Sequence, residues 1–155
     1  MTREFTCDIE CREDVSRQSP GRIVGTLIEL GRVAGDRREV FTPGSVRFPS
    51  NGVRLLAEHR GRQVTRFEPV IDGSEIRIDH PLPDTAIGRE VAAEIRGGRK
   101  RAMSIEFHAL EEAQVQGVRE VRGALIDAAA IVAAPAYQQA RVEVRRHDGV
   151  RRLWL

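Results

Sequence analysis

The chain has 155 residues, of which 41% are hydrophobic and 31% are charged, and this suits one domain with its own core. Its 25 basic and 23 acidic residues leave a formal net charge of +2, which excludes a general attraction to nucleic acid. No apolar run approaches the roughly 20 residues that cross a bilayer, and no signal-like segment is present. We therefore expect a soluble, intracellular protein with no membrane contact.

The first half of the sequence predicts short strands separated by turns. Residues 1–20 are polar and end in a Ser-Pro-Gly turn, and we expect a first strand or an N-terminal arm there. Runs rich in β-branched and aliphatic residues predict strands at 22–30, 38–41, 53–59, 63–71 and 75–79. Asp72 and Gly73, between the last two runs, are typical of a hairpin. The prolines after His80 restrict that segment to an edge or a loop.

One amphipathic helix is predicted, at about 85–96. Apolar residues recur there at spacings of four, Asp84 or Thr85 can cap the first turn, and Gly97 ends the last one. Residues 124–134 are almost continuously apolar, and their pattern leaves helix and strand both open.

The remaining segments complete a mostly β, α+β domain. We expect a turn at 116–117, a strand at 118–122 and a last strand at 140–146. Residues 1–146 should form the single domain, and residues 147–155 should be a C-terminal tail that folding does not need.

Residues 101–108 alternate strictly between apolar and polar side chains. As a strand, this stretch would place Ser104, Glu106 and His108 on one face and the apolar residues on the other. A serine fixed on a strand is held as a nucleophile has to be, and it needs a base within hydrogen-bond reach. The sequence offers four histidines, at His59, His80, His108 and His147. An isolated serine on such a strand is, however, more often an ordinary polar residue.

The sequence contains no recognisable metal site. Cys7 and Cys11 lie four residues apart in a polar segment, and no further cysteine or nearby histidine completes a zinc set. We expect two free thiols, no metal and no other cofactor.

Five short motifs follow one another along residues 22–142. They are Gly-Thr-Leu at 25–27, Phe-Thr-Pro-Gly at 41–44, Leu-Leu-Ala-Glu-His at 55–59, a helix entered through Thr85 and leading to Met-Ser-Ile-Glu-Phe at 103–107, and Ile-Val-Ala-Ala-Pro-Ala-Tyr at 131–137. Each motif alone is weak. In this order and spacing they resemble the tailed-phage prohead (capsid maturation) serine protease family.

The resemblance implies a serine endopeptidase with a β-barrel core like that of the herpesvirus assembly proteases. Ser104 matches the nucleophile and His59 the general base, while Arg99, Lys100 or Arg101 could stabilise an oxyanion. The implied substrate is the major capsid protein or its scaffold segment. Cleavage would take place inside the assembling prohead in the host cytoplasm, and the resemblance leaves homo-oligomer formation open.

The third catalytic residue departs from the family pattern. Many members carry an acidic residue at the position of Ala128, whereas Asp127 lies one residue earlier, and one residue on a strand reverses the face. Asp127 is the first candidate, by way of a bulge or a local shift. Glu106 and His108 are the alternatives, because they share the face of Ser104.

Two functions of other classes are alternatives to a protease. The first is a non-catalytic capsid-assembly protein with the same fold, since fold alone does not establish activity. The second is a nucleic-acid-binding β-barrel that uses the arginine clusters at 37–38, 99–101 and 145–146. A single Trp and a single Tyr argue against that second reading, because they give almost no surface for base stacking.

Overall fold

The computed structural model describes residues 2–12, 20–33, 38–133 and 142–145, with the first and last of these ranges described by backbone alone. These residues form eleven strands and one helix, so the predicted mostly β, α+β class is confirmed. The strands are β1 (Thr2–Arg12), β2 (Arg22–Glu29), β3 (Glu39–Phe41), β4 (Val46–Arg47), β5 (Val53–Leu56), β6 (Gln63–Phe67), β7 (Val70–Asp72), β8 (Glu75–Pro81), β9 (Ala102–Val115), β10 (Val118–Val132) and β11 (Val142–Arg145). The helix is α1 (Ala86–Arg96).

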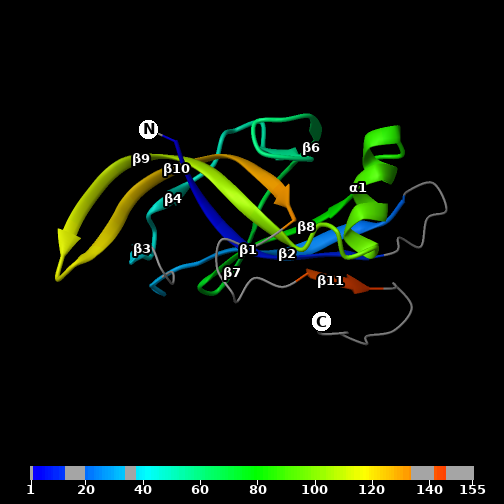
Figure 1. The fold of residues 1–155 in the computed structure, drawn as a ribbon. Coiled ribbons are helices and arrows are strands. Elements are labelled where there is room, and N and C mark those ends of the chain that lie inside the picture. Colours follow the sequence, from blue (N-terminus) through cyan, green and yellow to red (C-terminus); the bar gives the residue numbers. More distant parts are fainter. Residues whose placement is uncertain (1, 13–19, 34–37, 134–141, 146–155) are drawn as a thin grey trace.

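The strands pair in the order β6-β5-β10-β9-β1-β2-β8-β7, with β3 and β4 added to β10 and β11 added to β1 (Figure 1). β6 and β7 stand at opposite ends of this path, although only Glu68 and Pro69 separate them along the chain. The sheet therefore curls until its two ends meet at that link. The described strands do not close the expected β-barrel, because β6 and β7 do not pair.

The main hydrophobic core lies within this curl. It takes aliphatic and aromatic side chains from most of the strands and from α1. Two of its aromatic rings, Phe41 and Phe107, meet edge to face with their centroids 4.9 Å apart. A second, small apolar cluster of Leu56, Ala128 and Ala130 is separate from it.

α1 begins and ends where the sequence predicts. The Thr85 hydroxyl accepts a hydrogen bond from the backbone N–H of Gly88 at 3.1 Å, which caps the first turn. Gly97 caps the last turn, and the chain enters β9 only a few residues later. α1 thus leads directly into the strand that carries Ser104.

Two strand predictions need correction, and one open choice is resolved. The strand predicted over 53–59 ends at Leu56, because the chain turns there and the N–H of Ala57 donates to the Arg62 carbonyl at 2.9 Å. The run 63–71 is divided into β6 and β7 at Glu68 and Pro69. The open choice at 124–134 is resolved for its described part: residues up to Val132 continue β10, which pairs with β9 on one side and with β4 and β5 on the other.

Two predicted turns are confirmed, and the predicted tail lies outside the described residues. Asp72 ends β7 and Gly73 turns the chain into β8, which is the expected hairpin. The turn at 116–117 is also found, between β9 and β10, and this long hairpin extends past β3 and β4 (Figure 1). The proposed tail at 147–155 and His147 lie outside the described residues.

Candidate active site

Ser104 lies near the start of β9, on the strand face that is turned away from the main core. The residues on either side of it, Met103 and Ile105, are fully buried in that core, as the alternation predicts. Ser104 pairs in register with Ala130 of β10 and is only 1% exposed. Within the described part of the chain, its hydroxyl has no hydrogen-bond partner. The strand therefore holds a buried hydroxyl in a fixed position.

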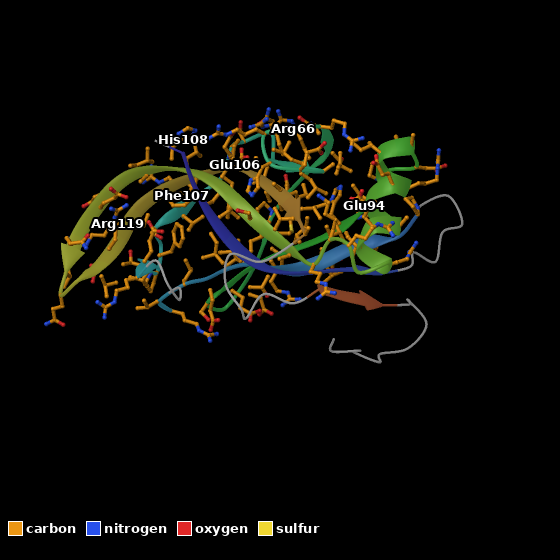
Figure 2. The ribbon with its side chains drawn as sticks, viewed as in Figure 1. Arg66, Glu94, Glu106, Phe107, His108 and Arg119 are labelled. Carbon is orange, nitrogen blue, oxygen red and sulfur yellow. The ribbon has the colours of Figure 1, made fainter. Side chains whose placement is uncertain are left out.

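Glu106 lies two residues beyond Ser104 on the same face. Figure 2 shows Glu106 and His108 on the opposite side of β9 from Phe107. Glu106 is a charged side chain that is only 7% exposed, and such a group needs polar partners. Its Oε1 accepts a hydrogen bond from the backbone N–H of Arg60 at 3.3 Å.

His59 lies in the tight turn that follows β5. Its Nδ1 is 3.9 Å from Oε1 of Glu106, an ion-pair distance rather than a hydrogen-bond distance. The turn is closed by the N–H of Gly61, which donates to the Glu58 carbonyl at 3.1 Å. The same Glu106 oxygen thus contacts the backbone of the turn and faces the imidazole that the turn presents.

This arrangement suits acid–base chemistry. A carboxylate on the Nδ1 side of a histidine favours the tautomer with a proton on Nδ1, and it stabilises the imidazolium that forms when Nε2 takes up a second proton. Ser104 lies on the same strand as Glu106, and that strand pairs with β10, which in turn pairs with β5, the strand before the His59 turn.

Asp127 lies at a bulge in β10. The register with β9 shifts between Ile126 and Ala128, and a bulge relaxes the strict alternation of side chains. The Asp127 carboxylate accepts a hydrogen bond from Arg54 at 2.6 Å, in an ion pair whose side chains are 37% and 33% exposed respectively. The choice of Asp127 as the third residue stays a prediction. The carboxylate beside His59 in this structure is Glu106.

A profile of the family described as caudovirus prohead serine protease matches residues 29–151. The chain belongs to this prohead protease family. The solved structure of the bacteriophage T4 capsid assembly protease, gp21, matches with a TM-score of 0.60 and 13% identity, over 87% of this chain and 98% of that one. At this identity the likeness shows a shared fold. A comparison with curated proteins gives no match.

Two further histidines, His80 and His108, are described in this member of the prohead protease family. His108 is exposed on β9. His80 is on β8, which β1 and β2 separate from β9. Partial burial and the nearby Arg22 hold the pKa of His80 below its usual value, against the opposing charge of Asp79.

The cationic run before β9 contacts β10 and the loop that follows α1. Lys100 Nζ donates to the Ile131 carbonyl at 3.4 Å, and Arg101 Nε donates to the Gly98 carbonyl at 3.0 Å. Their part in an oxyanion hole stays a prediction, as does the expected likeness to the herpesvirus assembly proteases. Of the arginines considered for nucleic-acid binding, Arg37 and Arg146 are outside the described residues.

Within the ranges that the structure describes, no helix is long and apolar enough to span a membrane. In the same ranges, no three His, Cys, Asp or Glu side chains gather as metal ligands would. For Cys7 and Cys11, only the backbone of β1 is described.

Arg62 was not among the predicted site residues, although its carbonyl closes the His59 turn and its side chain contacts two glutamates. The sequence signal for its contact with Glu58 is their spacing of four residues. The second glutamate, Glu90, lies on α1, and nothing in the sequence links it to the turn.

Proposed function

We propose that this chain is a serine endopeptidase that cleaves the major capsid protein, or a scaffold segment attached to it, inside the assembling prohead in the host. Membership of the prohead protease family supports the reaction class. The observation that carries the proposal is the position of His59, 3.9 Å from Glu106 on the strand face that holds Ser104. Formation of a homo-oligomer stays a prediction.

The proposed reaction is acyl transfer in two halves. Ser104 Oγ attacks the scissile carbonyl carbon while His59 Nε2 takes up the hydroxyl proton. The tetrahedral intermediate collapses, the C–N bond breaks, and His59 returns the proton to the leaving amine. Water then attacks the acyl-enzyme with His59 again as base, which releases the acid product and restores the Ser104 hydroxyl.

We propose Glu106 as the carboxylate that orients His59. It contacts both the imidazole and, through the Arg60 N–H, the turn that carries it. Asp127 is the second candidate, on the family argument that places an acidic residue one position later. Its contact with Arg54 supports instead a role in fastening β5 to β10.

The test is co-expression with the capsid protein of the same phage, followed by mass measurement of every chain. We expect Ser104→Ala and His59→Ala each to lower the cleavage rate by at least about a thousandfold. The double variant should be hardly slower than either single one, because the two residues work as a unit. His80→Gln is the control, a histidine far along the sheet, and it should cleave normally.

The same assay separates the two carboxylates. Glu106→Gln should cost roughly a hundredfold or more, yet less than His59→Ala, because an orienting carboxylate is not a reacting group. Asp127→Asn should change the rate only a few-fold. If Asp127→Asn is the crippled variant and Glu106→Gln is normal, the family argument was right and the assignment of Glu106 fails.

A non-catalytic capsid-assembly protein is the second candidate function, and one observation favours it. The Ser104 hydroxyl is buried, and no hydrogen bond joins it to His59 among the described residues. Catalytic hydrogen bonds are often long before substrate binds, so this geometry does not decide between the two functions. A folded chain that leaves the capsid protein intact and takes up no serine-directed fluorophosphonate would establish the second candidate.

A further inference from the structure

The turn that carries His59 is short and tightly bonded. The Ala57 N–H and the Arg62 carbonyl close its ends, and the Gly61 N–H donates to the Glu58 carbonyl within it. Arg60 adopts a φ of 51°, in the left-handed region that non-glycine residues seldom occupy. Such a conformation persists only where the surrounding contacts hold it. Contacts from the surrounding side chains must therefore hold this turn in place.

The Arg62 side chain supplies the most extensive of those contacts. Its Nε donates to Oε1 of Glu58 at 2.9 Å, inside the same turn. Its two terminal nitrogens donate to the two carboxylate oxygens of Glu90 at 2.8 and 3.3 Å. A guanidinium bound at both oxygens of one carboxylate fixes direction as well as distance. Arg62 thus bridges the turn to the middle of α1.

The exposure of this bridge argues against a role in stability alone. The Arg62 side chain is 55% exposed and that of Glu90 is 43% exposed, and exposed ion pairs contribute little to the free energy of unfolding. Three directed hydrogen bonds nevertheless restrict where the turn can sit. The bridge therefore fixes the position of the His59 turn relative to α1.

α1 is also the element that leads into Ser104. After the helix ends, the backbone N–H groups of Arg99 and Lys100 both donate to the Glu94 carbonyl, and β9 starts at Ala102. The chain therefore carries the position of α1 directly into the start of the serine strand. Through Arg62 and Glu90, the same helix also holds the turn with His59.

We propose that Arg62 is a positioning residue that ties the His59 turn to α1, so that one helix sets the placement of both the base and the nucleophile. The expected effect on the cleavage rate rests on the proposed peptidase function. The placement of the His59 turn by Arg62 does not. If the base is misplaced by about an ångström, the chemical step can slow by roughly a hundredfold while substrate binding is untouched.

The test compares variants of the full chain on the purified capsid protein. We expect Arg62→Ala to lower kcat by roughly ten- to a hundredfold with little change in KM. Arg62→Lys should recover only part of the loss, because an ammonium cannot hold both oxygens of Glu90 in a planar fork. Arg62→Ala with Glu90→Ala should be no worse than Arg62→Ala alone.

Arg89→Ala is the matched control. Arg89 lies next to Glu90 on α1 and forms an exposed ion pair with Asp84, a residue that precedes the helix and is not part of the turn. A merely structural contribution from surface ion pairs should affect both arginine variants alike. A loss of kcat confined to Arg62 variants supports positioning, and equal rates for Arg62→Ala and Arg89→Ala overturn it.

A second readout is independent of cleavage. The ¹⁵N shifts of the His59 ring report its tautomer and hydrogen bonding, and we expect Arg62→Ala to move them while Arg89→Ala leaves them in place. If the parent chain shows no peptidase activity, the proposed function fails, yet the His59 shifts still decide whether Arg62 positions the turn. Unchanged His59 shifts in Arg62→Ala overturn the positioning role.

Discussion

At the scale of single residues, His80 shows how the folded chain alters a titratable group. It pairs in register with Ile23 of β2, near the end of β8 that β7 does not reach. Arg22 and Asp79 form an ion pair at 2.9 Å beside it. Burial and the positive charge of Arg22 both disfavour the imidazolium, and only Asp79 favours it. The pKa of His80 is therefore lower in the folded chain than in the unfolded one.

This shift predicts a loss of stability in acid. Below the unfolded pKa of about 6.5, the unfolded chain binds a proton that folded His80 resists, so the free energy of unfolding falls as the pH falls through that value. We expect His80→Gln to flatten the decline of the unfolding midpoint between about pH 7.5 and about pH 5. Thermal unfolding across this range is the measurement, with the exposed His108→Gln as control. An unchanged slope in His80→Gln would contradict the prediction.

The sequence predicted which face of the β9 strand each side chain occupies, but it did not predict which side chains meet in the folded chain. Alternation placed Ser104 and Glu106 opposite the core residues, and the structure agrees. It could not rank Glu106 against Asp127, because that ranking depends on a bulge in β10 and on a turn after β5 that brings the Arg60 N–H onto Glu106. Both are tertiary features that period-2 patterning does not encode.

At the scale of elements, α1 is fastened at its start by a close backbone approach. An ideal Cβ on Gly88 would lie 2.0 Å from the Pro83 carbonyl oxygen and 3.2 Å from the Thr85 hydroxyl that caps the helix. The absence of a side chain at Gly88 therefore allows the segment before the helix to fold back over the first turn. A glycine inside a helix normally weakens it, whereas the packing at Gly88 requires one.

Gly88→Ala should accordingly destabilise the domain, although alanine is the better helix former. We expect a cost of about 1–3 kcal/mol, since the backbone oxygen cannot move aside as a flexible side chain can. Denaturant unfolding measures this cost. Gly123→Ala on β10 is the control, because its Cβ would meet Glu111 Cβ at an ordinary 3.4 Å. Equal stability of Gly88→Ala and the parent would mean that the first turn of α1 shifts freely.

Element prediction left one choice open and misplaced one strand end, and pairing partners decide both outcomes. Alanine-rich residues 124–134 fit a helix by propensity, but β10 has strands on both sides and buries its alanines on both faces. The strand predicted to end at His59 stops three residues earlier, and that early stop creates the turn that presents the histidine. Propensity cannot foresee either result, because neighbouring strands override it.

At the scale of the whole molecule, the two faces of β9 lie in different surroundings. One face contributes Phe107 to the main core, where it meets Phe41 across the curl of the sheet. The other face carries Ser104 and Glu106 beside the small apolar cluster of Leu56, Ala128 and Ala130. A change on the core face should therefore alter how much chain is folded, and a change on the other face should alter what the folded chain does.

Phe107→Ala tests this separation. Removing a fully buried phenylalanine should cost about 3–5 kcal/mol, because it removes apolar contacts and leaves a cavity. For a chain of this size the unfolding midpoint should fall by roughly 6–20 °C. Well below that midpoint, cleavage of the capsid protein per folded molecule should stay within a few-fold of the parent. The matched control is Leu110→Ala, whose side chain on the same strand is 62% exposed and should change neither quantity. If Phe107→Ala loses activity as completely as Ser104→Ala while most chains remain folded, the two faces of β9 are not independent. The core would then have to be counted among the groups that hold the site in place.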